Sequence, residues 1–439
     1  MQLPATLTEL QRAISGGELS ARQAWRLQRE RRAALDQRWH CLSEPLDDAS
    51  AQASESGPLA GIGLAHKDNF DTWDRSPGCG AGLGRKAPGR PAAWAVEQLR
   101  QAGAGHLGAL VMAEHACGAT SANTHFERCI NPLHPDAVVG GSSSGSAVAV
   151  AGGLAYGALG TDTAGSVRIP AATCGLVGLK TTQGLIPTQG LSPLAPALDT
   201  IGVLARTVAD AAELLKPLAP TLPPPAAAAP QLRAWIPGDW LHAEVARALG
   251  ELAGELGAQP ADLQSDHQHL SGLADVVLHG QVAQLQRAPL LAGQLSPSVQ
   301  ALALPGLLMP PAWLPAALAV RCGELRRFCQ SHLPAGSVLM LPALPHPVPD
   351  WQTVHPGQPG FVARELLALH RCMGFINYLG LPALVLPIAR DSRGLPISVQ
   401  LVGRPFHEHE LLALAAQLQE RRFGSAGFKP GWHMLATEN

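Results

Sequence analysis

Strand-like and helix-like stretches alternate along most of this chain, and that alternation limits the possible folds more than any other feature. Short apolar runs that suit buried strands occur at residues 61–65, 106–112, 157–161, 232–236, 337–341, 383–388 and 397–402. Helical stretches such as residues 92–102, 208–215 and 243–256 lie between them. Strands that alternate with helices build a sheet with helices packed on its faces. The sequence therefore predicts an α/β fold with one extended sheet.

A proline-rich segment marks the main division of the chain. Residues 216–230 contain six prolines, at positions 217, 220, 223, 224, 225 and 230, and such a composition is typical of a linker. We nevertheless expect residues 1–439 to form a single domain. Its expected parts are N-terminal helices (1–55, with Ser20 as a cap), a core (56–215), a variable region (216–335) and a C-terminal part of the core (336–439).

Composition restricts the partners and the compartment. Apolar residues make up 46% of the chain, charged residues 15%, and the net charge is -2, so we expect a large core and no binding of nucleic acid or acidic membrane. The eight cysteines include no Cys-x-x-Cys pair, which favours reduced thiols over a zinc site. The first residues lack the basic start of a signal peptide. These features predict a cytoplasmic protein.

Residues 301–320 form an uncharged run of 20 residues that by length alone could span a bilayer. Prolines at 305, 310, 311 and 315 oppose a regular helix through it. We expect an apolar wall or lip, with a shallow membrane contact as the less favoured alternative.

Three side chains have the spacing and chemistry of an acyl-transfer site. Ser142 lies 75 positions after Lys67, and Ser166 lies 24 positions after Ser142. Both serines lie in segments of small residues that tolerate unusual backbone geometry. Ser166 would be the nucleophile, Ser142 a second hydroxyl that relays its proton, and Lys67 the amine that accepts it, which is possible without a histidine. A flexible glycine and serine linker is the alternative for the Ser142 segment.

Lys67 follows an apolar run, and the chain has only five lysines against 27 arginines. Burial lowers the pKa of a lysine, and only the neutral amine can take a proton. A lysine that extends from a strand end to water is the alternative.

The segments around these residues resemble the amidase signature family. The resemblance rests on Gly140-Gly141-Ser142-Ser143, on Gly160-Thr161-Asp162-Thr163-Ala164-Gly165-Ser166-Val167-Arg168-Ile169-Pro170, and on further blocks at residues 59–69, 174–180, 377–383 and 400–403. It covers residues 55–205 closely and 335–420 loosely. It implies the amidase signature fold, a large mixed sheet covered by helices on both faces, and a cis peptide bond at Ser142.

Backbone N-H groups of a small-residue turn would bind the oxyanion of the tetrahedral intermediate. We assign this role to Thr163, Ala164, Gly165 and Ser166. Ala164 stands where the family usually has glycine, which is compatible with a backbone donor only at negative φ. Ser143, Asp162 and Arg168 are expected to support the turn, with Asp162 and Arg168 paired to each other or to the loop backbone.

The histidines offer few competing sites. His407-Glu408-His409-Glu410 could suggest metal, but alternate residues of a helix point in different directions, and acidic residues at a helix start have an ordinary dipole explanation. His66 should face away from Lys67 on its strand. A phosphate loop at residues 140–147 lacks the required lysine, because Ser146 and Ala147 follow Gly145. We expect no metal and no cofactor.

The predicted function is hydrolysis of a carboxylic amide C-N bond through an acyl-enzyme on Ser166. Two alternatives are hydrolysis of a ureide or carbamoyl group and delivery of ammonia in the manner of an A-type amidotransferase component, and a non-catalytic scaffold is a third. The expected partner is a small-molecule amide, and a homodimer is possible. The regions around residues 301–327 and 360–377 are expected to line the acyl pocket, where Arg321, Arg326 and Arg327 could bind a carboxylate or be solvated.

Overall fold

The computed structural model describes residues 3–45, 53–82, 90–225 and 229–428. Its centre is a sheet of eleven strands in the order β1-β3-β2-β4-β6-β5-β10-β11-β9-β7-β8. The strands are β1 (Leu42–Pro45), β2 (Gly63–Lys67), β3 (Gly105–Leu110), β4 (Gly157–Asp162), β5 (Val177–Lys180), β6 (Thr200–Ala205), β7 (Gln231–Ala234), β8 (Gln259–Pro260), β9 (Ser337–Pro342), β10 (Ala383–Arg390) and β11 (Pro396–Val402). The sheet is mixed, because β2 runs parallel to β3 and β4 while β6 is antiparallel to both β4 and β5.

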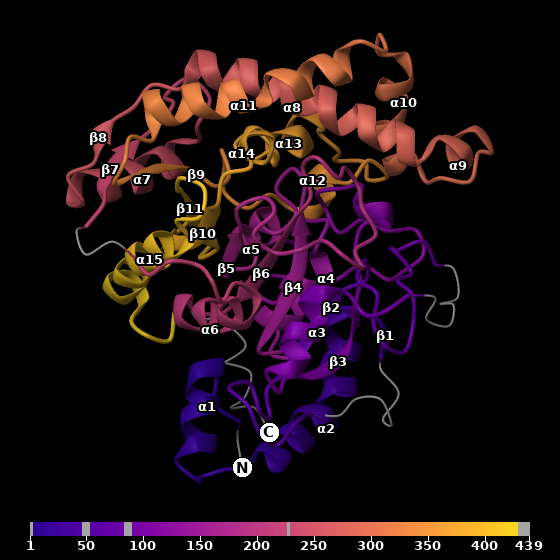
Figure 1. The fold of residues 1–439 in the computed structure, drawn as a ribbon, viewed down its shortest axis with the longest axis vertical. Helices are drawn as coiled ribbons and strands as arrows, with labels where there is room; N and C mark the ends of the chain where they lie inside the picture. Colours follow the sequence, from indigo (N-terminus) through magenta and orange to yellow (C-terminus); the bar gives the residue numbers. More distant parts are fainter. Residues whose placement is uncertain (1–2, 46–52, 83–89, 226–228, 429–439) are drawn as a thin grey trace.

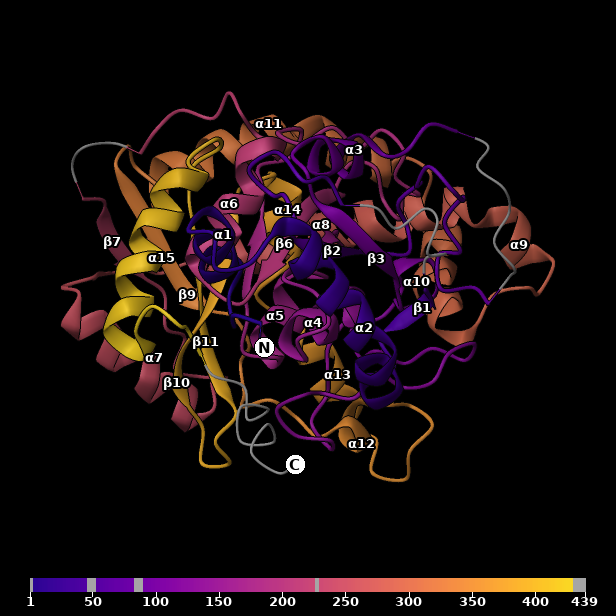
Figure 2. The same cartoon turned by 90° about the horizontal axis from the view of Figure 1, so that it is seen from below.

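Helices cover both faces of this sheet (Figures 1 and 2). On one face lie α1 (Leu7–Ser15), α3 (Trp94–Gln101), α6 (Val208–Leu218), α7 (Ala243–Glu255) and α15 (Glu408–Phe423). On the other lie α2 (Ala21–Trp39), α4 (Ser144–Ala151) and α5 (Arg168–Thr173), together with α8 (Gln264–Leu285), α11 (Trp313–His332) and α14 (Gly374–Leu379). The predicted mixed sheet with helices on both faces is confirmed.

The remaining helical segments are short or peripheral, apart from α10. They are η1 (Glu114–Ala116), α9 (Arg287–Leu291), α10 (Pro297–Leu308), α12 (Trp351–Val354) and α13 (Ala363–Ala368). In Figure 1, α8 and α11 lie across one end of the molecule, at the top of the view.

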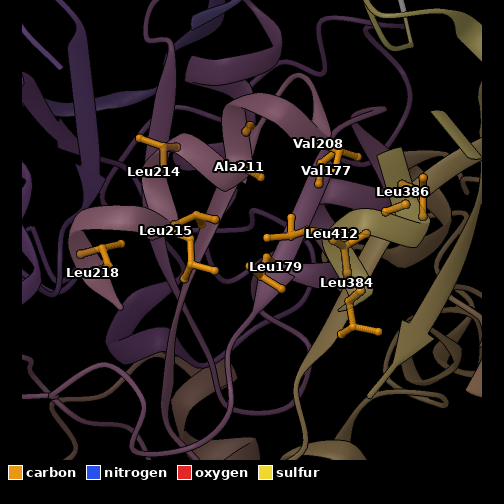
Figure 3. Packing of buried hydrophobic residues seen from close by; sticks show 14 of the residues in the cluster. Val177, Leu179, Val208, Ala211, Leu214, Leu215, Leu218, Leu384, Leu386 and Leu412 are labelled. Carbon is orange, nitrogen blue, oxygen red and sulfur yellow. The ribbon is translucent and has the colours of Figure 1, made fainter. Parts of the chain in front are cut away.

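Alternation of side chains along the strands explains how both faces acquire a core. Leu179 of β5 and Leu384 of β10 point to the face covered by α6 and α15, where Leu215 and Leu412 meet them (Figure 3). The intervening Ala383 belongs to the cluster on the opposite face, as expected for successive residues of a strand. Each fully buried leucine contributes roughly 1.5–3 kcal/mol of hydrophobic stabilisation.

The predicted strands correspond to β2, β3, β4, β7, β9, β10 and β11, with shifts of up to two residues at most ends. Ser20 caps α2 as expected, accepting a hydrogen bond from the N-H of Gln23. The linker prediction was wrong at its start, because α6 runs through Pro217 to Leu218. Residues 226–228 of the predicted linker lie outside the described residues.

The apolar run at 301–320 forms two helices rather than one. It contains the end of α10 and the start of α11, which meet at an angle of 93° across the break at 309–312. The expectation that no regular helix runs through it is confirmed, although Pro305 is tolerated within α10. Among the described residues no single helix is long and apolar enough to cross a membrane, and α10 with α11 meets that criterion only as a bent pair, by length and composition.

Candidate active site

Parallel pairing of β2 and β4 brings the first two parts of the site together. His66 pairs with Leu159 in that ladder, so the carboxyl ends of both strands reach the same edge of the sheet. Lys67 is the last residue of β2, and Thr161 lies next to the end of β4. The amine of Lys67 donates to Thr161 Oγ1 at 2.8 Å.

Ser142 lies against the same amine. Its Oγ accepts a hydrogen bond from Lys67 Nζ at 2.7 Å, and the side chains of both residues are buried. The peptide bond between Gly141 and Ser142 is cis, as the resemblance implied. The structure therefore joins Lys67 and Ser142, which are 75 positions apart in the sequence.

Close packing around α4 fixes the Ser142 loop. A Cβ atom added to Gly145 would lie 2.6 Å from the backbone oxygens of Cys41 and Val111, so only glycine fits in the first turn of this helix. Glycine here lets the start of α4 approach β3 closely. The loop that carries Ser142 consequently sits directly on the sheet.

Ser166 lies at the N-terminal end of α5, two residues before its first residue, Arg168. Its side chain keeps a small exposed fraction of 5%, whereas Ser142 has none. The backbone N-H of Ser143 donates to the carbonyl oxygen of Ser166 at 3.2 Å, and this bond ties the two serine loops together. No hydrogen bond joins Ser142 Oγ to Ser166 Oγ among the described residues.

Asp162 and Arg168 form the expected pair, and both side chains are fully buried. Arg168 Nη2 donates to Asp162 Oδ1 at 2.8 Å and its Nε donates to Oδ2 at 3.0 Å. Burial alone would raise the pKa of Asp162, but the charge and hydrogen bonds of Arg168 hold it well below its ordinary value. The turn from 162 to 168 is thus closed by a bidentate ion pair.

The predicted oxyanion turn has an engaged member. The N-H of Gly165 donates to Asp162 Oδ1 at 2.9 Å, so it is not available to a substrate. Among the described residues no acceptor is seen for the N-H groups of Thr163, Ala164 and Ser166. Ala164 does not adopt positive φ, whereas Gly165 has φ 112°, so the alanine found in place of the family's usual glycine is accommodated without strain.

Burial dominates the electrostatics of Lys67. It lowers the pKa of the amine to about 7, while the charges of Asp199 and Asp162 oppose this shift. His66, on the same strand, stacks on His106 with ring centroids 4.8 Å apart, and burial lowers its pKa to about 3. His66 is therefore a packed, neutral histidine, as its position predicted.

Several contributors to the site were missed by sequence reasoning. Asn69 Nδ2 donates to Thr161 Oγ1 at 3.0 Å, and Asn377 Nδ2 donates to the carbonyl oxygen of Asp162 at 2.8 Å. A ring nitrogen of His370, Nδ1, lies 2.7 Å from the carbonyl oxygen of Ala164. Thr161 and Asn69 stand in the recognised motifs, but nothing in the sequence indicates that Asn377 and His370 would reach this turn.

The arginines considered for carboxylate binding are occupied by the protein itself. Arg321 donates to the carbonyl oxygens of Ala197 at 2.8 Å and Asn377 at 3.1 Å. Arg327 forms ion pairs with Asp266 and Glu324. Among the described residues, no group of three or more His, Cys, Asp or Glu side chains could hold a metal ion.

Comparison with known proteins places this site in a family. The family model described as Amidase matches residues 24–229 and 306–412. The A-type component of the glutamyl-tRNA(Gln) amidotransferase of Moorella thermoacetica is 32% identical over 430 residues, with 85% of each chain covered. The same component from Chromohalobacter salexigens is 42% identical over 224 residues, which cover 49% of this chain and 46% of that protein. The chain thus spans less than half the length of some of the curated relatives it matches.

A solved structure agrees with this placement. A crystal structure of an amidase superposes with a TM-score of 0.84 at 29% identity, covering 95% of this chain and all of that one. The family model includes both serine loops and the strand that carries Lys67. The chain therefore belongs to the amidase signature family.

Proposed function

We propose that this protein hydrolyses a carboxylic amide C-N bond through an acyl-enzyme on Ser166. The observation that carries the proposal is the buried amine of Lys67 at 2.7 Å from Ser142 Oγ, next to the loop that holds Ser166. A lysine with a pKa near 7 is neutral in a large fraction of molecules at neutral pH, and a neutral amine can accept a proton.

In the proposed reaction, Lys67 takes the proton of Ser142 while Ser142 takes the proton of Ser166. Ser166 Oγ then bonds to the amide carbon, and the oxyanion that forms accepts hydrogen bonds from N-H groups of Thr163, Ala164 or Ser166. The C-N bond breaks as the proton returns along the same path to the leaving nitrogen. Water hydrolyses the acyl ester and releases the acid.

The relay needs a contact that the free structure lacks, namely a hydrogen bond from Ser166 Oγ to Ser142 Oγ. Catalytic hydrogen bonds often tighten only when substrate is bound. A rotation of the Ser166 side chain about Cα-Cβ is the smallest movement that could supply it.

A second candidate is favoured by the relatives. The relative aligned over 85% of both chains is an amidotransferase component, so delivery of the released ammonia to a second enzyme is the alternative use of the same chemistry. Hydrolysis predicts ammonia or amine release by the purified chain alone, whereas the amidotransferase role predicts productive turnover only with a partner enzyme.

The test combines a substrate panel with active-site labelling. Ammonia or amine release is measured from aliphatic, aryl and ureido amides, and a fluorophosphonate probe is located by peptide mass spectrometry. We expect the label on Ser166 and its absence from Ser166→Ala. Ser146→Ala is the matched control, because the hydroxyl of Ser146 is buried on α4 and donates to the carbonyl oxygen of Leu159 at 3.1 Å. A folded wild-type protein that neither labels at Ser166 nor releases amine would be a scaffold.

A further inference from the structure

Asp199 is a buried carboxylate next to the candidate oxyanion turn, just before β6. Its Oδ1 accepts a hydrogen bond from Thr163 Oγ1 at 2.6 Å. Its Oδ2 accepts from the N-H groups of Leu194 at 3.0 Å and Ala195 at 3.2 Å. The residue is only 4% exposed, and it forms no ion pair with a described residue. A buried negative charge is thus held by neutral donors alone.

The turn connects this carboxylate to the proposed base. Thr163 lies two residues after Thr161, whose hydroxyl accepts the hydrogen bond from Lys67 Nζ. The acidic groups that act on Lys67 are Asp199, Asp162 and the thiols of Cys79 and Cys117. Each of the last three can be compared with Asp199 in charge.

Asp199 differs from the other three groups. The charge of Asp162 is balanced by Arg168 at 2.8 Å. Burial raises the pKa of Cys79 to about 11 and that of Cys117 to about 12, so both thiols are neutral at neutral pH. Asp199 is therefore the anion near Lys67 whose charge no arginine or other lysine of the described chain neutralises by direct contact.

The two groups affect each other in opposite directions. The charge of Asp199 opposes the lowering of the Lys67 pKa by burial. Burial raises the pKa of Asp199 itself, while the hydroxyl of Thr163, the two N-H groups and the charge of Lys67 counteract that rise. A general base works best when its pKa is near the working pH, so a neighbouring carboxylate makes the buried amine a stronger base.

We propose that Asp199 is a positioning residue that fixes Thr163 in the oxyanion turn and, by its charge, stabilises the protonated form of Lys67 during proton transfer. This inference rests on the proposed function, because it concerns the same reaction. Asp199 touches neither the substrate nor the reacting atoms and acts through Thr163 and Lys67.

The substitution Asp199→Asn separates the two effects, because it keeps an oxygen acceptor for Thr163 and removes the charge. The acidic limb of kcat/KM is expected to move to lower pH by about half to one unit. The alkaline plateau should fall by up to about tenfold per pKa unit lost by Lys67. Thr163→Val removes the hydroxyl and keeps the charge, so it should lower the plateau and leave the limb in place.

Two further variants control for a merely structural role. Asp210→Asn changes another buried carboxylate, which accepts hydrogen bonds from Thr8, and should not move the limb. Asp199→Glu keeps the charge and should keep the limb, which provides a test if Asp199→Asn does not fold. Thermal melting of each variant establishes folding.

The outcomes distinguish this inference from the proposed function. An unchanged limb in folded Asp199→Asn, or a limb that moves in Thr163→Val or Asp199→Glu, overturns the role of Asp199 while Ser166 remains essential. Loss of the limb in Asp199→Asn would identify Asp199 as the titrating group and also overturns the inference. Turnover by Ser166→Ala would instead overturn the proposed function.

Discussion

Two buried lysines at the ends of two strands of the same sheet differ in what they can do. Lys67 ends β2 and Lys180 ends β5, with 1% and 0% of their surfaces exposed. Burial lowers the pKa of each amine to about 7. Neither makes an ion pair with a described residue. By burial and pKa alone, the two sites are equivalent.

Their partners separate them. Lys67 donates to the hydroxyls of Ser142 and Thr161, whereas Lys180 donates to the main-chain carbonyl oxygens of Thr181 at 3.0 Å and Leu381 at 2.7 Å. A hydroxyl can give up a proton to an amine, but a carbonyl oxygen only accepts a hydrogen bond. A lowered lysine pKa therefore does not identify a base, and the chemistry of its neighbours does.

The largest expected difference between the two lysines is in turnover. Lys67→Met should lower kcat/KM by about 10²–10⁴-fold, the usual contribution of proton transfer, while Lys180→Met should change it only a few-fold. Steady-state kinetics on the best amide of the panel measures both. Comparable losses in two folded variants would remove the functional distinction between the sites.

A third buried cation, Arg168, shows what direct pairing changes. Arg168→Met leaves the carboxylate of Asp162 buried without its cation, so the free energy of unfolding should fall by about 3–5 kcal/mol. Arg327→Met, at an exposed ion pair with Asp266 and Glu324, is the control and should cost about 0–1 kcal/mol. Urea denaturation followed by circular dichroism measures both. Equal losses would contradict the importance of burial.

Much of this site could be predicted from the sequence because its residues stand in contiguous motifs. Lys67, Ser142 and Ser166 were chosen from spacing and composition, and the structure brings Lys67 to Ser142. The strand before Lys67 was expected at 61–65 but lies at Gly63–Lys67, because Gly61 adopts φ 74° and cannot belong to it. This shift places the lysine on the strand itself.

What could not be predicted depends on contacts between distant segments. Asp199 meets Thr163 across 36 positions, and Asn377 meets Asp162 across 215, and no local pattern records such pairs. Strand β6, at Thr200–Ala205, was missed, although its pairing with β4 and β5 builds the centre of the sheet. The engagement of the Gly165 N-H with Asp162 likewise depends on the closed turn.

Both lysines should affect stability as the pH changes. In the unfolded chain each amine titrates near 10.5, and in the folded protein near 7. Between these values the unfolded state binds more protons, so the free energy of unfolding rises with pH, by at most about 1.4 kcal/mol per pH unit for each lysine. Lys67→Met and Lys180→Met should each reduce this slope. Urea midpoints from pH 7.5 to 10 measure it, and a slope that neither variant changes would mean that the amines titrate normally when buried.

The smallest expected effect concerns the hydroxyls beside each lysine. Thr161→Val keeps the shape of the side chain but removes the acceptor at 2.8 Å from Lys67 Nζ. Loss of one hydrogen bond of about 1 kcal/mol to the protonated amine should move the acidic limb of kcat/KM to lower pH by less than about one unit. Thr181→Val is the matched control, because the side chain of Thr181 donates to the carbonyl oxygen of Ile201 and only its main-chain oxygen contacts Lys180. That oxygen survives the substitution, so the limb should stay where it is. A pH profile that shifts equally in both variants would show that the limb responds to general loosening of the sheet, and the distinction between hydroxyl and carbonyl partners would then lose its support.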